Sequence, residues 1–156
     1  MDKAKVLDSL LSALEEEFRH AVSASQDAAE YATNEESRAE SRWDTQGLEA
    51  SYLAAGQAGQ AKQWAEAIQE LKAERMDFLK NYETVALGAF FECELDGVKE
   101  KFIFAGMAGG QVLEVNGGQV TVITKHSPLA HRVVGHRAGD SFELPNGRPG
   151  RLLFVE

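Results

Sequence analysis

The stretch RWDTQGLEASYL, residues 42–53, places Trp43, Asp44 and Gly47 in the middle of a long helix-forming sequence. Tryptophan and glycine are poor choices for a solvated helix surface, so this stretch is either a turn that ends a helix or a functional tip. Asp44 could N-cap a helix that begins after it. Trp43 could anchor the tip against a partner or a nucleotide, or fold back over Leu48.

Acidic residues are concentrated around this stretch. Residues 1–84 contain 17 acidic and 9 basic side chains, whereas residues 85–156 contain 8 and 7. The formal net charge of the 156-residue chain is −9, which argues against a protein that mainly binds a nucleic-acid backbone, because such proteins need lysine and arginine to neutralise phosphates. We therefore expect no independent DNA binding.

Histidine and cysteine offer little further chemistry. His126, His131 and His136 recur every five residues, which a helix spreads over different faces, whereas helical zinc ligands recur after three or four. Cys93 is the only cysteine, which excludes an internal disulfide, and we expect it to be a small buried hydrophobe. Residues 1–18 lack a long apolar core, so we expect no signal peptide, no membrane span and a cytoplasmic location.

The composition changes near Thr84. Before it there is no proline, and apolar residues recur every three or four positions among strong helix formers. After it come all three prolines and most runs rich in valine, phenylalanine and isoleucine. We predict an antiparallel coiled-coil hairpin over residues 1–83, with its tip near 42–47, and a second domain over residues 84–156.

The apolar stripes of the two predicted helices match as an antiparallel pair. In such a hairpin the residue numbers of contacting partners have a constant sum, here 85 or 86, which puts the centre at Trp43–Asp44 and gives arms of about 57 Å. Large residues meet near the base and alanines near the tip. The predicted pairs include Leu7 with Leu79, Leu10 with Met76, Leu14 with Leu71, Phe18 with Ile68, and Ser25 with Ala61.

The second half reads as short strands with one helix. Asp96–Gly97 and Asn116–Gly117 each separate two apolar runs, which is a strong hairpin signal. Ser127 and Pro128 predict an N-cap and a first helical residue, with the helix ending at Gly135 or Gly139. The fold class is therefore α+β, with a helical hairpin followed by a small antiparallel sheet and one short helix.

The C-terminal segment GGQVTVITKHSPLAHRVVGHRAGDSFELPNGRPGRLLFVE resembles the C-terminal, FKBP-like domain of the Gre family of bacterial transcription elongation factors. Ser127–Pro128–Leu129, Gly135, Gly139–Asp140 and Gly147 match the family pattern. The order of the two domains matches as well, and DTQGLEASYLAAGQ is similar to the stretch after the family's coiled-coil tip.

The resemblance implies that the second domain docks on bacterial RNA polymerase while the coiled coil enters its secondary channel. The matched residues Ser127, Pro128, Leu129, Gly139 and Asp140, with Trp43 at the tip, are then expected to contact the partner. Family tips hold acidic residues that help bind a Mg²⁺ ion in the polymerase active site, where the polymerase cleaves backtracked RNA. The resemblance thus implies no cofactor of its own, indirect contact with nascent RNA and no enzyme activity of its own. A hairpin that folds on itself predicts a monomer.

The tip departs from the family pattern of two acids three residues apart. Asp44 occupies the first acidic position, which implies a role as Mg²⁺ ligand, but Gly47 and Leu48 replace the following glutamate and asparagine. Glu49, or Glu40 from the other arm, is the remaining candidate for the second acid. Three functions stay open: a factor that promotes transcript cleavage, a channel binder that regulates transcription without cleavage, and a coiled-coil adaptor unrelated to polymerase.

Overall fold

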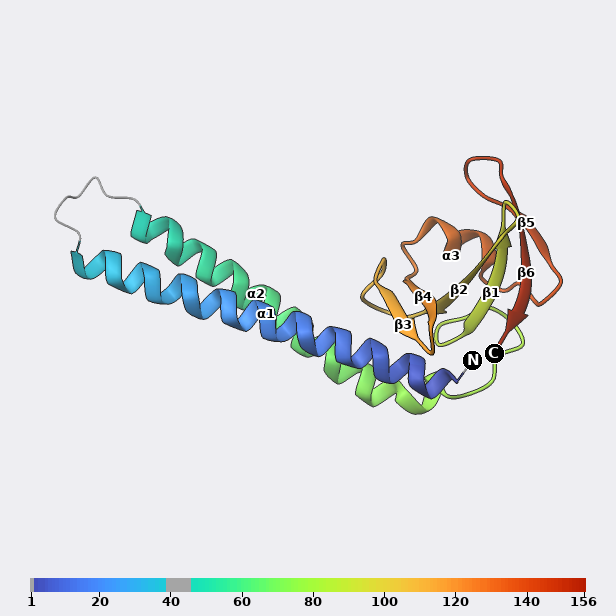
Figure 1. Ribbon diagram of the computed structural model, residues 1–156, viewed down its shortest axis with the longest axis horizontal. Helices are drawn as coiled ribbons and strands as arrows, with labels where there is room; N and C mark the ends of the chain where they lie inside the picture. The colour runs from blue at the N-terminus through green and yellow to red at the C-terminus, as the bar shows by residue number, and fades with distance from the viewer. Residues whose placement is uncertain (1, 39–45) are drawn as a thin grey trace. The chain divides into compact units, whose positions relative to one another are not determined.

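The computed structural model describes residues 2–38 and 46–156, and the side chains of 32–48 and 50 lie outside the description. Two helices, α1 (Lys3–Arg38) and α2 (Gln46–Phe78), precede six strands and one short helix (Figure 1). The predicted fold class, α+β with an N-terminal helical hairpin and a sheet domain with one short helix, is confirmed. No helix within the described ranges is both long and apolar enough to cross a membrane.

The chain forms two compact units. One comprises Ser12–Glu70, and the other comprises Met1–Leu11 together with Leu71–Glu156. The base of the hairpin therefore belongs with the sheet, and the rest of the hairpin is a unit of its own. The predicted boundary between residues 83 and 84 stays a prediction.

The inward positions of both helices recur at alternating spacings of three and four. In α2 this series runs through Ala61, Trp64, Ile68, Leu71, Arg75 and Phe78, all buried or half-buried. In α1 the buried residues include Leu7, Leu10, Leu14, Ala21 and Ala28. This is the coiled-coil heptad spacing. As predicted, large side chains fill the inward positions near the base, and alanines replace them farther along each helix.

The predicted register of the hairpin is wrong in detail. Ser25 Oγ donates to the carbonyl of Ala54 at 3.2 Å. Ala54 precedes the predicted partner, Ala61, by seven residues. Met76, predicted to face Leu10, is 74% exposed, because the three-and-four alternation passes from Leu71 to Arg75 and Phe78 and leaves Met76 outside. Arg75 instead pairs with Asp8 at 2.8 Å.

The strands are β1 (Phe90–Leu95), β2 (Val98–Phe104), β3 (Val112–Val115), β4 (Gly118–Ile123), β5 (Ser141–Glu143) and β6 (Pro149–Val155). They form one sheet in the order β3-β4-β2-β1-β6-β5. All neighbours are antiparallel except β2 and β4, which pair in parallel, whereas the sequence predicted a wholly antiparallel sheet. At both predicted hairpin turns, Asp96–Gly97 and Asn116–Gly117, the two central residues have positive φ, as type I′ turns require.

The helix α3 (Pro128–Val133) packs on one face of the sheet (Figure 1). Its Ala130 and Val133 join a buried cluster with the strand residues Phe91, Cys93, Phe102, Phe104, Ile123 and Leu152. Phe91 and Phe102 stack with ring centroids 5.4 Å apart. This core holds α3, and hence the Ser127–Leu129 segment, in a fixed place on the domain.

Lys3 joins the first turn of α1 to the sheet domain. The residue is 5% exposed, and its ammonium group donates to the main-chain oxygens of Lys80 at 2.7 Å and Glu156 at 3.0 Å. The Nζ atom also lies 4.6 Å from the centre of the Tyr82 ring. A buried ammonium group is costly unless its protons find acceptors, and this arrangement supplies two carbonyls and an aromatic face.

We expect Lys3→Met to lower the free energy of unfolding by about 1–3 kcal/mol, because it removes the ammonium group that donates to the main-chain oxygens of Lys80 and Glu156. The Glu156 oxygen still accepts from the Phe90 amide at 2.8 Å. Chemical denaturation monitored by circular dichroism measures the change. Lys5→Met is the matched control, since Lys5 lies two residues away and is exposed. Equal effects of the two substitutions would contradict a special role for Lys3.

Burial lowers the pKa of Lys3 from 10.5 to about 8, although the charge of Glu156 raises it. Between these values the unfolded chain binds more protons at this position than the folded chain, so folding becomes more favourable as pH rises. We expect the free energy of unfolding of the wild type, measured relative to that of Lys3→Met, to increase as pH rises from about 8 to 10.5. A constant difference across this range would contradict the lowered pKa.

Candidate functional site

The predicted tip residues Trp43 and Asp44 lie outside the described residues, as does Glu40. Glu49 is in the first turn of α2 and its side chain is exposed. An acid in the first turn of a helix interacts favourably with the helix dipole, which is a structural role that needs no partner. Its exposure also leaves the carboxylate accessible to a ligand.

The distal unit exposes bulky side chains that the sequence analysis did not single out. Tyr52 is 69% exposed and Leu53 is 55% exposed, whereas the next residue, Ala54, is half-buried. The heptad spacing in the sequence could have predicted this exposure. Counting back from Ala61 in steps of three and four reaches Ala54, so Tyr52 and Leu53 lie outside the inward series. Together with the exposed Glu49 they form an accessible surface of mixed character on the first turns of α2.

The predicted docking residues Ser127, Pro128 and Leu129 begin α3. Pro128 is exposed at the first helical turn, and Leu129 packs against the buried cluster of the domain. Ser127 is the N-cap residue of α3 and Pro128 follows it at the start of the helix, as predicted, but the Ser127 hydroxyl makes no capping hydrogen bond. It accepts a hydrogen bond at 2.9 Å from the amide of Thr124, which lies before the helix. Ser127 thus fixes the loop that leads from β4 into α3, and α3 ends at Val133, before either predicted glycine.

Gly139 and Asp140 form the turn that leads into β5. The Gly139 amide donates to the carbonyl of Leu152 at 2.7 Å, and its φ of 95° is a conformation that side chains disfavour. The Asp140 carboxylate accepts a hydrogen bond at 2.8 Å from the Arg137 amide, although the residue is exposed. Both residues therefore have structural roles, and the Asp140 carboxylate also faces solvent.

The loop between α3 and this turn is tied to the segment that follows α2. The Val85 amide donates to the carbonyl of His136, and the Gly135 amide donates to the carbonyl of Val85, both at 2.9 Å. The ring of His136 lies edge-on to Phe142, with centroids 6.3 Å apart. These contacts hold the loop between α3 and β5 against Val85 and Phe142.

No group of three or more histidine, cysteine or acidic residues suited to a metal ion occurs within the described ranges. Cys93 is buried, and burial, with the nearby charges of Glu100 and Glu92, raises the pKa of its thiol to about 12. The thiol is therefore neutral at ordinary pH and acts as the small hydrophobe that was predicted. The described residues offer single accessible carboxylates rather than a complete metal site.

Comparisons with known proteins find solved structures that are similar to this chain, and three of them are described here. GreA factor homolog 1 (Gfh1) of Thermus thermophilus is 18% identical, with 94% of each chain covered and a TM-score of 0.35. The transcription factor Gfh1 is 22% identical, with 95% of this chain and 94% of that chain covered and a TM-score of 0.39. Gfh1 of Thermus aquaticus is 20% identical, with 99% and 95% covered and a TM-score of 0.35.

No protein-family profile and no curated protein matches the chain.

We expect Gly139→Ala to lower the free energy of unfolding by about 1–3 kcal/mol, because a methyl group disfavours the positive φ at this turn. Gly106→Ala is the matched control, since an added Cβ meets nothing within 4 Å at either position and Gly106 has no positive φ. Thermal or denaturant unfolding measures both. Equal stability of the two variants would show that the turn does not require glycine.

Proposed function

We propose that this chain is a Gre-type transcription factor that binds bacterial RNA polymerase in the cytoplasm, as a monomer, and promotes cleavage of backtracked transcripts. The C-terminal domain docks on the polymerase, and the helical hairpin enters the secondary channel. The observation that carries the proposal is the set of family-like motifs Ser127–Pro128–Leu129, Gly139–Asp140 and Gly147 in a sheet domain that follows a long helical hairpin.

The dimensions of the hairpin suit a probe of a narrow channel. The helices α1 and α2 have 36 and 33 residues, which correspond to about 54 Å and 50 Å. In the outer part of the Ser12–Glu70 unit the buried inward residues are Ala21, Ala28 and Ala61, whose small side chains let two helices approach closely. Such a thin outer part adds little buried apolar surface to stabilise the hairpin itself, but it would extend the length over which the hairpin can reach into a channel.

The proposed chemistry of the tip needs only a carboxylate. Mg²⁺ takes oxygen ligands and keeps several waters, and a second ion in a two-metal site activates the attacking water and stabilises charge on the phosphate. Asp44 would supply a ligand to an ion whose other ligands belong to the polymerase. Glu49 is the accessible neighbouring acid, and Trp43 would contact the partner or the RNA.

A second function of the same class is a channel binder that regulates transcription without cleavage. The observation that favours it is Gly47 at the position where the family carries its second acid. A third function is a coiled-coil adaptor that self-associates through residues 1–82. Size-exclusion chromatography with light scattering separates this third function from the first two, which require a monomer.

We expect the wild-type protein to accelerate RNA cleavage in a backtracked elongation complex of the cognate polymerase, and Asp44→Ala to lose most of that acceleration. Removal of one positioned transition-state ligand typically costs about 100-fold to 1,000-fold in rate. Asp27→Ala is the matched control, because Asp27 is an exposed acid on the same hairpin. Its acceleration should equal that of the wild type.

The other outcomes distinguish the alternatives. No acceleration by the wild type, combined with competition against a cleavage-competent Gre factor, would replace the first function by the non-cleaving channel binder. Neither acceleration nor competition would contradict both polymerase functions. Equal acceleration by the wild type and Asp44→Ala would keep the function but remove Asp44 from its chemistry.

A further inference from the structure

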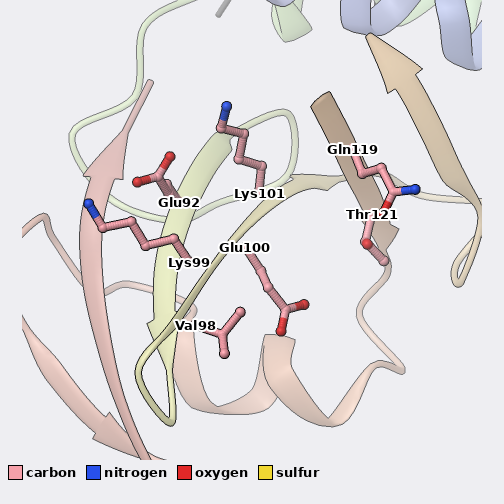
Figure 2. Close-up of a pocket in the computed structure, with 7 residues that line it drawn as sticks. All are labelled: Glu92, Val98, Lys99, Glu100, Lys101, Gln119 and Thr121. Atoms are coloured by element: carbon pink, nitrogen blue, oxygen red, sulfur yellow. The ribbon is translucent and has the colours of Figure 1, made fainter. Parts of the chain in front are cut away.

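The strands β2 and β4 are neighbours in the sheet over only part of their lengths. They pair in parallel at Phe102–Phe104, and before these residues the β2 segment continues beside β1 while the β4 segment continues beside β3. A hollow of about 600 Å³ opens where they diverge, lined by residues that include Lys99, Glu100, Lys101 and Gln119 (Figure 2). This volume is within the range of about 300–1,000 Å³ that ligand sites occupy.

The wall formed by β2 presents main-chain groups to this hollow. The Phe104 amide donates to Ala89 on the β1 side at 3.0 Å, whereas the Ala105 amide donates to Ile123 on the β4 side at 2.9 Å. Main-chain groups alternate in direction along a strand of an antiparallel pair. The amide and carbonyl of Lys99 therefore point away from β1, at a position where β4 no longer pairs with β2.

The wall formed by β4 does the same. The Val122 amide donates to Gln111 on the β3 side at 2.8 Å, so the main-chain groups of Gln119, three residues earlier, point away from β3 and toward β2. The hollow thus has a free strand edge on both sides. An unpaired strand edge is a template for an additional strand, since main-chain hydrogen bonds then supply affinity for an extended peptide.

Some charged residues that line the hollow have an oppositely charged neighbour on the adjacent strand, and one does not. Lys101 lies directly across from Glu92 and Lys99 directly across from Glu94, so each lysine has an acidic neighbour on β1. Glu100 lies across from Cys93, whose thiol is neutral, and its carboxylate extends to the other side of β2 from Lys101 (Figure 2). Among the residues that line the hollow, Glu100 is thus the charge without a cross-strand counterion.

We propose that the hollow between β2 and β4 binds an extended segment of a partner polypeptide, which adds as a strand along the Lys99 edge of β2 and directs a basic side chain toward Glu100. The main-chain groups of Lys99 and Gln119 hold the segment, and Glu100 selects its side chain. This site is separate from the polymerase contacts proposed above and does not depend on them.

The test uses two synthetic peptides, acetyl-Thr-Val-Lys-Val-Thr-amide and the same peptide with glutamate in place of lysine. Each is titrated into the full-length ¹⁵N-labelled protein and followed by NMR. We expect saturable shifts at the amides of Lys99 and Gln119, and slower hydrogen exchange at Lys99. The lysine peptide should bind about threefold to tenfold more tightly than the glutamate peptide, and Glu100→Gln should remove that preference.

Two controls separate strand addition from side-chain binding. The lysine peptide with N-methylated valines lacks the required donors and should not bind. Lys99→Pro removes an outward amide that bonds no strand in the described sheet, so it should abolish binding, whereas Lys99→Ala should retain it. The N-methylated peptide decides the question even where Lys99→Pro does not fold. No binding at millimolar peptide, shifts confined to other residues, or equal binding of the N-methylated peptide would each overturn the proposal.

Discussion

The buried ammonium group of Lys3 is the interaction on which the unit of Met1–Leu11 and Leu71–Glu156 depends. Its two acceptors belong to the residue that follows α2 closely and to the residue after β6, so one cation connects three parts of the chain. Removing a cation from water is costly, and this contact is favourable only while both carbonyls are in place. The first turn of α1, the end of the hairpin and the last strand are therefore held as one body.

The hairpin contrasts with this body in how it is stabilised. Its inward positions change from leucine and phenylalanine to alanine along each helix, so the apolar surface buried per turn decreases toward the tip. The exposed Tyr52 and Leu53 reverse the usual arrangement, because large apolar side chains face solvent while small ones face the partner helix. A distal unit built in this way has more to gain from a partner surface than from its own core.

Much of the fold could be predicted because local signals agree with the final structure. The turns at Asp96–Gly97 and Asn116–Gly117, the proline at the start of α3 and the heptad spacing each depend on nearby residues. The parallel pairing of β2 with β4 could not be predicted, since it depends on which strands meet across the sheet. The register of the hairpin failed at Met76 because hydrophobicity alone does not reveal which of several apolar residues follows the three-and-four alternation.

The candidate site has two parts, the docking residues of the sheet domain and the tip of the hairpin, and they were predictable to different degrees. The resemblance to a family pointed to Ser127–Leu129 and Gly139–Asp140, but it did not reveal the hydrogen bonds of Ser127 with Thr124 and of Asp140 with Arg137. Residues of this kind stabilise the fold and are also accessible to a partner, so residue type alone does not distinguish a structural role from a binding role. At the tip, Asp44 was identified from the family pattern alone, because it lies outside the described residues.

The position of β6 in the sheet has a consequence for how the domain is assembled. β6 lies between β1 and β5, so this late segment of the chain is an interior strand. The β1–β2 and β3–β4 hairpins are closed by two-residue turns and can form early, whereas β1 must wait for a strand about sixty residues later in the sequence. During synthesis, the edge of β1 stays open until β6 has left the ribosome, and Lys3 lacks one of its acceptors until the same moment.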